Sequence, residues 1–470
     1  MLIVGAGLSG IGAAHFLQSR CPGKRYAILE GRERLGGTWD LFRYPGIRSD
    51  SDMYTLGYSF KPWTNPQAIA DGPSILAYIR ETAESAGIDR QIRYGHRVVR
   101  ARWSSADARW LVDIAGKPPI ACRFLYLCSG YYNYESGYSP AFPGRERFAG
   151  QIVHPQHWTD DIAYAGKRVV VIGSGATAVT LVPELAKQAA HVTMLQRSPT
   201  YIISLPSRDP IADWLREQLP ARSAYAVTRW KNVLLTMGFY QYARRFPARA
   251  KRLLVSGTLK ELRDVPDAAL HFTPSYNVWD QRLCLVPDGD LFHALRSGRA
   301  SVATDHIASF TEDGIALTSG AHLPADLIVT ATGLQLQFFG GMAFEVDGEH
   351  IEPARTMVYK GSMVSGVPNL AFASGYTNAS WTLKCDLTAM FVCRLLAHMD
   401  RHNYTRCVPR RDARVGELPL LDFSSGYIQR ALPTLPKQGA ARPWRLYQNY
   451  ALDRVMLERG PIDDAALELS

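Results

Sequence analysis

The sequence predicts an α/β protein with two Rossmann-like dinucleotide-binding domains. Two glycine-rich turns support this fold class, and each directly follows a short apolar run. Gly5-Ala6-Gly7-Leu8-Ser9-Gly10 follows residues 2–4, and a second turn at residues 173–178 follows residues 168–172. An apolar strand that ends in such a turn and opens into a helix is the fingerprint of a dinucleotide-binding βαβ unit. At 470 residues the chain is also too long for a single hydrophobic core.

Composition and charge narrow the functional classes. Apolar residues make up 47% and charged residues 20%, as in ordinary globular enzymes. The net charge of +10 suggests an anionic partner, but a basic surface without a special partner is the favoured interpretation. Phosphate-bearing cofactors would suffice as that partner, and we expect no nucleic acid because no basic recognition motif is present. The seven cysteines form no C-x-x-C and no zinc-finger spacing, so we expect reduced thiols, a cytoplasmic protein and no metal. No apolar run approaches the roughly 18 residues of a transmembrane helix.

The first glycine turn predicts one cofactor site. Its glycines let backbone amides approach a pyrophosphate at a helix N-terminus, where the dipole favours negative charge. A second apolar run, residues 26–29, ends in Glu30, whose carboxylate is placed to accept hydrogen bonds from an adenosine ribose. We therefore expect this cofactor to contact Gly5, Gly7, Ser9, Gly10 and Glu30. So few residues precede the first strand that we also expect the native chain to start further upstream.

The second turn predicts a different nucleotide. It comprises Gly173, Ser174, Gly175, Ala176, Thr177 and Ala178, with alanine in place of the third glycine, a replacement that dinucleotide sites tolerate. The next apolar run ends in Arg197 and Ser198 instead of an acidic residue. A cation at this place matches a 2′-phosphate, and a ribose acceptor is missing. The second site therefore favours NADPH over NADH, with an exposed, non-binding arginine as the alternative.

Two longer motifs lie between and after these turns. The first runs Gly36-Gly37-Thr38-Trp39, then Tyr44-Pro45-Gly46 and Asp50; the second is Phe148-x-Gly150-x3-His154-x3-Trp158. They resemble the signatures of class B flavoprotein monooxygenases, and within these the type I Baeyer–Villiger monooxygenases of the ethionamide-activating group. The resemblance extends from Gly5 to the region of Trp444. Thr159 departs from the usual Pro or Asp, and Gln281 stands where many relatives carry Lys.

The resemblance implies the identity of both cofactors and a catalytic pair. FAD would occupy the first site with further contacts to Gly37, Thr38, Trp39, Arg48, Asp50 and Val98, and NADPH would occupy the second. Arg282 would stabilise a C4a-peroxyflavin, and Asp50 would hold Arg282 in place at the reactive edge of the flavin. Each catalytic residue has a structural alternative: Asp50 as a turn residue and Arg282 as a domain-interface ion pair.

The resemblance also implies the domain layout. Residues 1–140 would form the first part of the FAD domain, and residues 141–325 the NADPH domain with a helical insertion at about 205–270. Residues 326–470 would complete the FAD domain and wrap around it. The insertion is rich in arginine, which indicates a solvated face or, as the less favoured alternative, a weak peripheral attraction to anionic lipid.

The implied activity is the insertion of one oxygen atom from O2 into ketones, giving esters or lactones, together with oxidation of thioethers. The alternative is an N- or S-oxygenating flavin monooxygenase without Baeyer–Villiger activity. A flavin disulfide reductase is disfavoured because no C-x-x-C dithiol is present. A non-catalytic flavin-binding scaffold is disfavoured because it needs none of Arg197, Arg282 and Asp50.

Overall fold

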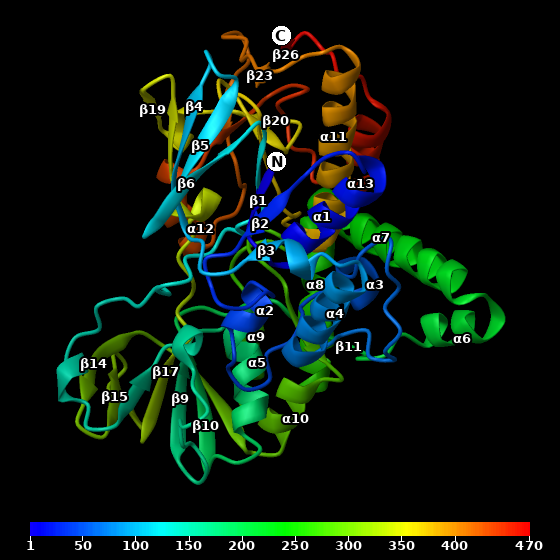
Figure 1. The fold of residues 1–470 in the computed structure, drawn as a ribbon. Helices are drawn as coiled ribbons and strands as arrows, with labels where there is room; N and C mark the ends of the chain where they lie inside the picture. Colours follow the sequence, from blue (N-terminus) through cyan, green and yellow to red (C-terminus); the bar gives the residue numbers. More distant parts are fainter.

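The computed structural model describes residues 1–470, and two parallel five-stranded sheets organise it (Figure 1). The first sheet has the order β22-β7-β1-β2-β3. Its strands are β1 (Leu2–Val4), β2 (Ala27–Leu29), β3 (Ile92–Arg93), β7 (Leu125–Leu127) and β22 (Leu370–Phe372). Because β22 pairs in parallel with β7, the last third of the chain returns to the sheet that the N-terminus began.

The second sheet has the order β13-β10-β9-β17-β8 and is also entirely parallel. Its strands are β8 (Gln151–Val153), β9 (Arg168–Ile172), β10 (His191–Gln196), β13 (Ala300–Thr304) and β17 (Leu327–Thr330). Strand β17 lies between β9 and β8, so this sheet extends beyond residue 325, where the sequence had placed the domain boundary. All four residues of β17 are buried, because a neighbouring strand pairs with β17 on each side.

Side chains along each strand point alternately to the two faces of the sheet, and other elements pack against both faces. In β1, Ile3 joins the core beneath α1 (Leu8–Arg20) and α11 (Trp381–Arg401), whereas Leu2 and Val4 join the core on the opposite face. The second sheet packs against α5 (Ala176–Leu185) and α10 (Asp290–Arg296). Smaller helices near the first sheet are α2 (Thr38–Leu41), α3 (Met53–Leu56) and α4 (Gly72–Ser85).

Smaller sheets close the outer faces. One is mixed and has the order β19-β18-β4-β5-β6, with β18 parallel to β4 and the other pairs antiparallel. It comprises β4 (Val98–Ser104), β5 (Arg109–Ile114), β6 (Lys117–Cys122), β18 (Ala343–Val346) and β19 (Glu349–Ile351). Trp103 of β4 pairs directly with Trp110 of β5. A three-stranded sheet comprises β14 (Ile307–Thr311), β15 (Gly314–Leu317) and β16 (His322–Pro324). The C-terminal third adds β20 (Val358–Tyr359), β21 (Met363–Val364), β23 (Cys407–Pro409), β24 (Glu417–Pro419), α12 (Gly426–Ala431), β25 (Lys437–Gly439), α13 (Tyr450–Arg454) and β26 (Leu467–Leu469).

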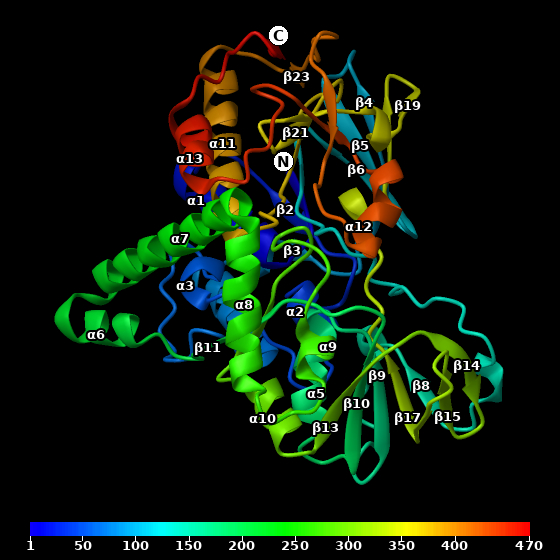
Figure 2. The ribbon, with the colours of Figure 1, turned by 180° about the vertical axis from the view of Figure 1, so that it is seen from behind.

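A helical insertion separates two strands of a small parallel sheet, β11 (Ile202–Leu205) and β12 (Cys284–Pro287). It comprises α6 (Pro210–Gln218), α7 (Ala221–Arg245), α8 (Pro247–Glu261) and α9 (Ala268–Phe272). In Figures 1 and 2, α6 and one end of α7 project away from the body of the molecule. None of the helices is both long and apolar enough to cross a membrane.

A buried arginine attaches the insertion to the first domain. The guanidinium of Arg229 on α7 donates to the carbonyl oxygens of Tyr54 (2.8 Å) and Gly57 (2.7 Å). Its Nη2 also lies 3.6 Å from a carboxylate oxygen of Asp386 on α11. Because both charged side chains are buried, each depends on the other and on the carbonyl groups for its stability.

Candidate active site

Both glycine turns open onto the same cavity, which has a volume of about 1170 Å³. Pockets for a single small ligand are typically about 300–1,000 Å³, so this cavity has room for more than one. Helix α1 begins after Gly7 and α5 after Gly175, and no side chain caps either N-terminus. The free N–H groups and the positive ends of both helix dipoles therefore remain available to anionic groups in the cavity.

The glycines of the two turns divide into two kinds. A Cβ atom on Gly5 would lie 2.5 Å from the Cys128 carbonyl oxygen, and one on Gly173 would lie 2.3 Å from that of Ala331. The fold itself requires these glycines. Gly175 has an ordinary φ of −79° and nothing within 4 Å of an added Cβ, yet it lines the cavity. The absence of a side chain on Gly175 therefore leaves space on the cavity side of the backbone, where a pyrophosphate would need to approach closely.

Gly7 repeats the pattern of Gly175, with φ −84° and no neighbour closer than 3.4 Å to an added Cβ. The residues at the third position of each turn, Gly10 and Ala178, differ from Gly7 and Gly175 because they are packed inside the protein. A Cβ on Gly10 would lie 1.9 Å from the Gly5 carbonyl oxygen, and Ala178 is fully buried. Neither residue lines the cavity, so both support the turn through close packing between helix and strand.

Glu30 follows β2 and lines the cavity beside the first turn. One carboxylate oxygen accepts a hydrogen bond from the Ala6 N–H (2.8 Å) and the other from the Arg32 N–H (3.0 Å). Burial raises the pKa of Glu30, and these two hydrogen bonds oppose the rise. Each carboxylate oxygen retains an acceptor position for a ligand hydroxyl.

The other residues predicted at the first site also lie around the cavity, but two of them are engaged by other side chains. Gly37, Thr38, Trp39 and Val98 line the cavity. The Ser9 hydroxyl accepts a hydrogen bond from the Trp381 indole at 2.8 Å, which ties the first turn to the start of α11. Arg48 also lines the cavity, but its guanidinium forms an ion pair with Asp290 at the start of α10. Arg48 thus connects the first segment to the second domain.

At the second turn, Ser174, Ala176, Thr177, Arg197 and Ser198 all line the cavity. The Ser174 hydroxyl lies 2.8 Å from the Thr200 hydroxyl and donates to the Ser198 carbonyl oxygen at 3.2 Å. Arg197 is exposed and forms no ion pair, so its charge is available to an anionic ligand.

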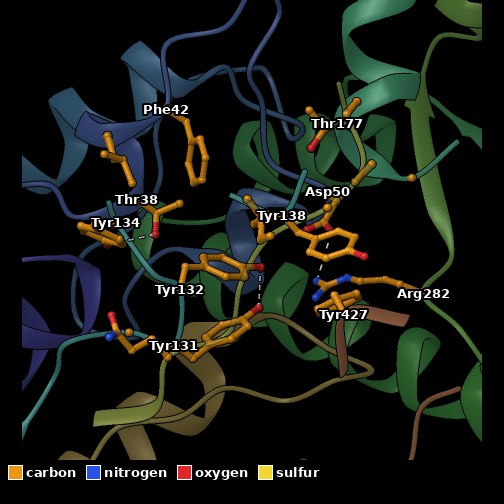
Figure 3. A pocket seen from close by; sticks show the side chains of 18 of the residues that line it. Thr38, Phe42, Asp50, Tyr131, Tyr132, Tyr134, Tyr138, Thr177, Arg282 and Tyr427 are labelled. Atoms are coloured by element: carbon orange, nitrogen blue, oxygen red, sulfur yellow. Dashed lines mark hydrogen bonds and ion pairs between the residues drawn. The ribbon is translucent and has the colours of Figure 1, made fainter. Parts of the chain in front are cut away.

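Asp50 and Arg282 come together in the middle of the cavity (Figure 3). The Arg282 Nη2 lies 3.0 Å from the Asp50 Oδ2, and about a third of each side chain (34%) is open to the cavity. The negative charge of Asp50 raises the pKa of Arg282. The sequence had left open whether Arg282 forms a domain-interface ion pair; it does pair with Asp50, within a cavity that both turns share.

Tyrosines surround this ion pair, and sequence analysis did not assign them to the site. The hydroxyl groups of Tyr131 and Tyr132 are 2.7 Å apart, and Tyr131 stacks on Trp381 with ring centres 4.8 Å apart. Tyr427, from α12, lies beside Arg282 (Figure 3). Burial raises the pKa of Tyr132 well above its ordinary value and that of Tyr427 to about 12, so both phenols stay neutral.

The loop that carries Arg282 is held from outside the cavity. Trp279 has φ +71°, a conformation in which bulky residues are rare. The next carbonyl oxygen, that of Asp280, accepts hydrogen bonds from the Ser424 N–H (2.9 Å) and hydroxyl (3.1 Å). Arg244 of α7 bridges the carboxylates of Asp280 and Asp422 at 3.5 and 3.6 Å. The C-terminal segment and the insertion thus fix the Arg282 loop together.

His154 directly follows β8, in the linker that connects β8 to β9 within the second sheet. Its Nε2 lies 3.2 Å from the Gly333 carbonyl oxygen, and its Nδ1 accepts a hydrogen bond from the Gln156 N–H at 3.2 Å. Only the neutral tautomer with its proton on Nε2 satisfies both contacts. Burial lowers the pKa of His154, which favours the same neutral form. The ring ties the linker to the crossing after β17.

The fold and this shared cavity define a protein with two dinucleotide-binding units. Residues 3–65 match the NAD(P)-binding Rossmann-like domain, and residues 70–212 match the flavin-binding monooxygenase-like family. The FAD-containing monooxygenase EthA of Mycobacterium tuberculosis is 56% identical over 475 residues, which cover 100% of this chain and 97% of that protein. The chain therefore belongs to the family of FAD-containing monooxygenases.

Solved structures share the whole fold. A crystal structure of OTEMO in complex with FAD and NADP superposes with a TM-score of 0.78 at 20% identity, covering 100% of this chain and 99% of that one. An ε-caprolactone-bound cyclohexanone monooxygenase gives a TM-score of 0.78 at 19% identity with the same coverage. At such low identity these likenesses establish the fold alone, which is the predicted α/β fold with two Rossmann-like domains.

Proposed function

We propose that the chain binds FAD at the first turn and NADPH at the second, and inserts one oxygen atom from O2 into ketones. The observation that carries this proposal is the Asp50–Arg282 pair, which lies in the one cavity onto which both turns open. Overall, a ketone, O2, NADPH and a proton give an ester or lactone, NADP+ and water. Thioethers would be oxidised to sulfoxides at the same site.

The residues around the first turn suit FAD. The N–H groups at the start of α1, behind Gly7, would bind its pyrophosphate, and Glu30 would accept hydrogen bonds from its adenosine ribose. Gly37, Thr38 and Trp39 would line the flavin, with Val98 near its adenine end. When bound and reduced, FAD supplies the activation of O2. The EthA relative is described as FAD-containing, which supports this assignment.

The residues around the second turn suit NADPH. The start of α5 behind Gly175 would bind the pyrophosphate, and Arg197 would pair with the 2′-phosphate. Arg48 is less suited to a cofactor contact than the sequence predicted, because Asp290 already neutralises its charge. The OTEMO structure with FAD and NADP supports the presence of two nucleotides in one fold.

Arg282 would stabilise the negative charge that develops on oxygen during the reaction. A cation that is already positioned needs no reorganisation at the transition state, which is why such groups contribute strongly. Asp50 keeps the guanidinium oriented toward the cavity. The Tyr131, Tyr132 and Tyr427 side chains would restrict water around the substrate and keep it beside Arg282.

Baeyer–Villiger activity is favoured over oxygenation of nitrogen or sulfur alone. The motif that ends in Asp50 and the motif that ends in Trp158 resemble the signatures of Baeyer–Villiger enzymes, which supports this choice. The bound ε-caprolactone of the cyclohexanone monooxygenase structure is a cyclic ester, the type of product that ketone oxygenation gives. An N- or S-oxygenating enzyme without this activity is the second candidate.

A labelling experiment tests the proposal. The holoenzyme is incubated with NADPH, isotopically heavy O2 and a panel of linear and cyclic ketones and thioethers. We expect esters or lactones that contain one heavy oxygen atom. Sulfoxides without any ester would establish the second candidate. Hydrogen peroxide as the sole product would refute both.

A further inference from the structure

The positive charge of the chain is concentrated in the helical insertion. Residues 218–260 contain nine lysines and arginines and no aspartate or glutamate, against a net charge of +10 for the whole chain. Three of these cations pair with carboxylates: Arg229 with Asp386, Lys231 with Asp209, and Arg244 with Asp280. The others give the outer surface of the insertion a strong excess of positive charge.

Exposed apolar side chains gather on the same helices. Ten of the fourteen exposed large apolar residues of the molecule lie between positions 205 and 253. Leu234 and Leu235 of α7 are 60% and 64% exposed, and Leu253 of α8 is 58% exposed. Monomeric proteins rarely leave contiguous apolar surface open to water unless it binds something.

Helix α7 ends at Arg245, Phe246 follows, and α8 begins at Pro247. Figure 2 shows the two helices meeting at an angle. Arg245 and Arg249 are exposed, and each guanidinium carbon lies 5.4 Å from the centre of the Phe246 ring. On α8, Arg252 and Leu253 follow Arg249 by three and four residues, so both lie on the same side of the helix as Arg249. Leu234 and Leu235 lie on α7 about three helical turns before Phe246. We use the name α7–α8 elbow for six exposed residues of the two helices: Leu234, Leu235, Arg245, Arg249, Arg252 and Leu253.

We propose that the α7–α8 elbow docks on an anionic lipid surface. Its leucines would enter the boundary between head groups and acyl chains, and its arginines would pair with lipid phosphates. A second copy of the chain is a poorer occupant, because two equivalent elbows would bring like charges together. Nucleic acid would leave the leucines exposed to water.

Flotation of the yellow holoenzyme with lipid vesicles tests this docking. We expect binding to vesicles that mix phosphatidylcholine with phosphatidylglycerol and none to phosphatidylcholine alone. Because ionic attraction drives the encounter, added salt should weaken the binding. If the wild-type protein fails to float with the mixed vesicles at low salt, the proposal is wrong.

Variants locate the surface. Replacing Arg245, Arg249 and Arg252 by Gln should weaken partitioning on the order of a hundredfold, at about 1 kcal/mol for each charge. Replacing Leu234, Leu235 and Leu253 by Ser should weaken binding even at low salt. Circular dichroism and flavin absorbance verify that each variant is folded, and the salt dependence of the wild type needs no variant.

A matched control removes the same number of charges elsewhere. Arg90, Arg109 and Arg123 are exposed and form no ion pairs, so the triple Gln variant has an equal net charge. We expect this control to bind vesicles as the wild type does. Equal losses in both triple variants would refute the elbow as the docking surface. The proposal is also refuted if light scattering shows a dimer that the elbow substitutions abolish, while the same substitutions leave vesicle binding unchanged.

Discussion

The sharpest test of the site replaces Arg282 by Met, an unbranched, flexible side chain without charge. The guanidinium faces Asp50 across 3.0 Å in the cavity that both glycine turns share. It contacts neither glycine turn through a hydrogen bond, and in our proposal each turn would bind phosphate through its own helix N-terminus. The Arg282→Met enzyme should therefore retain FAD and remain reducible by NADPH while it loses oxygenation of the substrate.

The size of the loss follows from the geometry. Two unit charges 3.0 Å apart interact by about 5 kcal/mol at an effective dielectric constant of about 20. About a third of each side chain is open to the cavity, so solvent screening reduces this value. Preorganised donors to a developing oxyanion contribute about 3–4 kcal/mol in enzymes. We therefore expect kcat for ester formation to fall about 10²–10³-fold.

The assay separates the two half-reactions. Anaerobic stopped-flow absorbance measures flavin reduction by NADPH, and chromatography measures the ester formed after O2 and ketone are added. We expect near-normal reduction, little ester and more hydrogen peroxide. Arg430→Met is the control, because this guanidinium lines the same cavity but lies 3.4 Å above the Tyr138 ring. Wild-type ester yield in Arg282→Met would remove Arg282 from the mechanism.

Four further predictions follow from individual contacts. Arg197→Ala should raise KM for NADPH about 10–100-fold and leave KM for NADH unchanged, as the loss of a charged hydrogen bond implies. An equal rise in both KM values would contradict the assignment of Arg197 to the 2′-phosphate. Gly175→Val should abolish NADPH-dependent reduction without lowering Tm, whereas Gly173→Val should unfold the protein, because its Cβ would meet a carbonyl oxygen at 2.3 Å. His154→Gln should lower Tm most above pH about 6.5, where the ring is neutral and its two hydrogen bonds stabilise the fold. Because burial lowers the pKa of His154 in the folded protein, protonation in acid destabilises the wild type, and its difference in Tm from the variant should shrink there. Ser424→Ala should reduce kcat up to about tenfold with KM for NADPH unchanged, since it removes one of two donors that hold the Arg282 loop; an altered KM would argue for a wider disturbance.

The sequence predicted the parts of the fold that depend on local patterns. A glycine turn after an apolar strand needs only neighbouring residues, so the predicted strand-turn-helix units at Gly5 and Gly173 are confirmed. The position of β17 could not be obtained in this way, because pairing with β9 and β8 is set by the whole sheet.

The parts of the site that sequence analysis missed depend on contacts between distant segments. Tyr131 and Tyr132 follow β7, and the carboxyl end of a parallel strand is where ligands bind in such sheets, so this signal was available. Tyr427 had no such signal, because α12 reaches the cavity only through the fold of the C-terminal segment. The partner of Arg48 was equally hidden, since Asp290 comes from the second domain.

The two glycine turns and the Asp50–Arg282 pair depend on different contacts, so we expect cofactor binding and oxygenation to be separable. Each glycine turn presents its helix N-terminus within a single domain. The Asp50–Arg282 pair joins the first segment of the chain to the edge of the insertion, and the Ser424 contacts add the C-terminal segment. The pair itself needs the first segment and the insertion to be docked, and the C-terminal segment holds the loop that carries Arg282. A change that loosens their docking should leave the protein yellow and reducible, yet unable to place a cation beside the reacting oxygen.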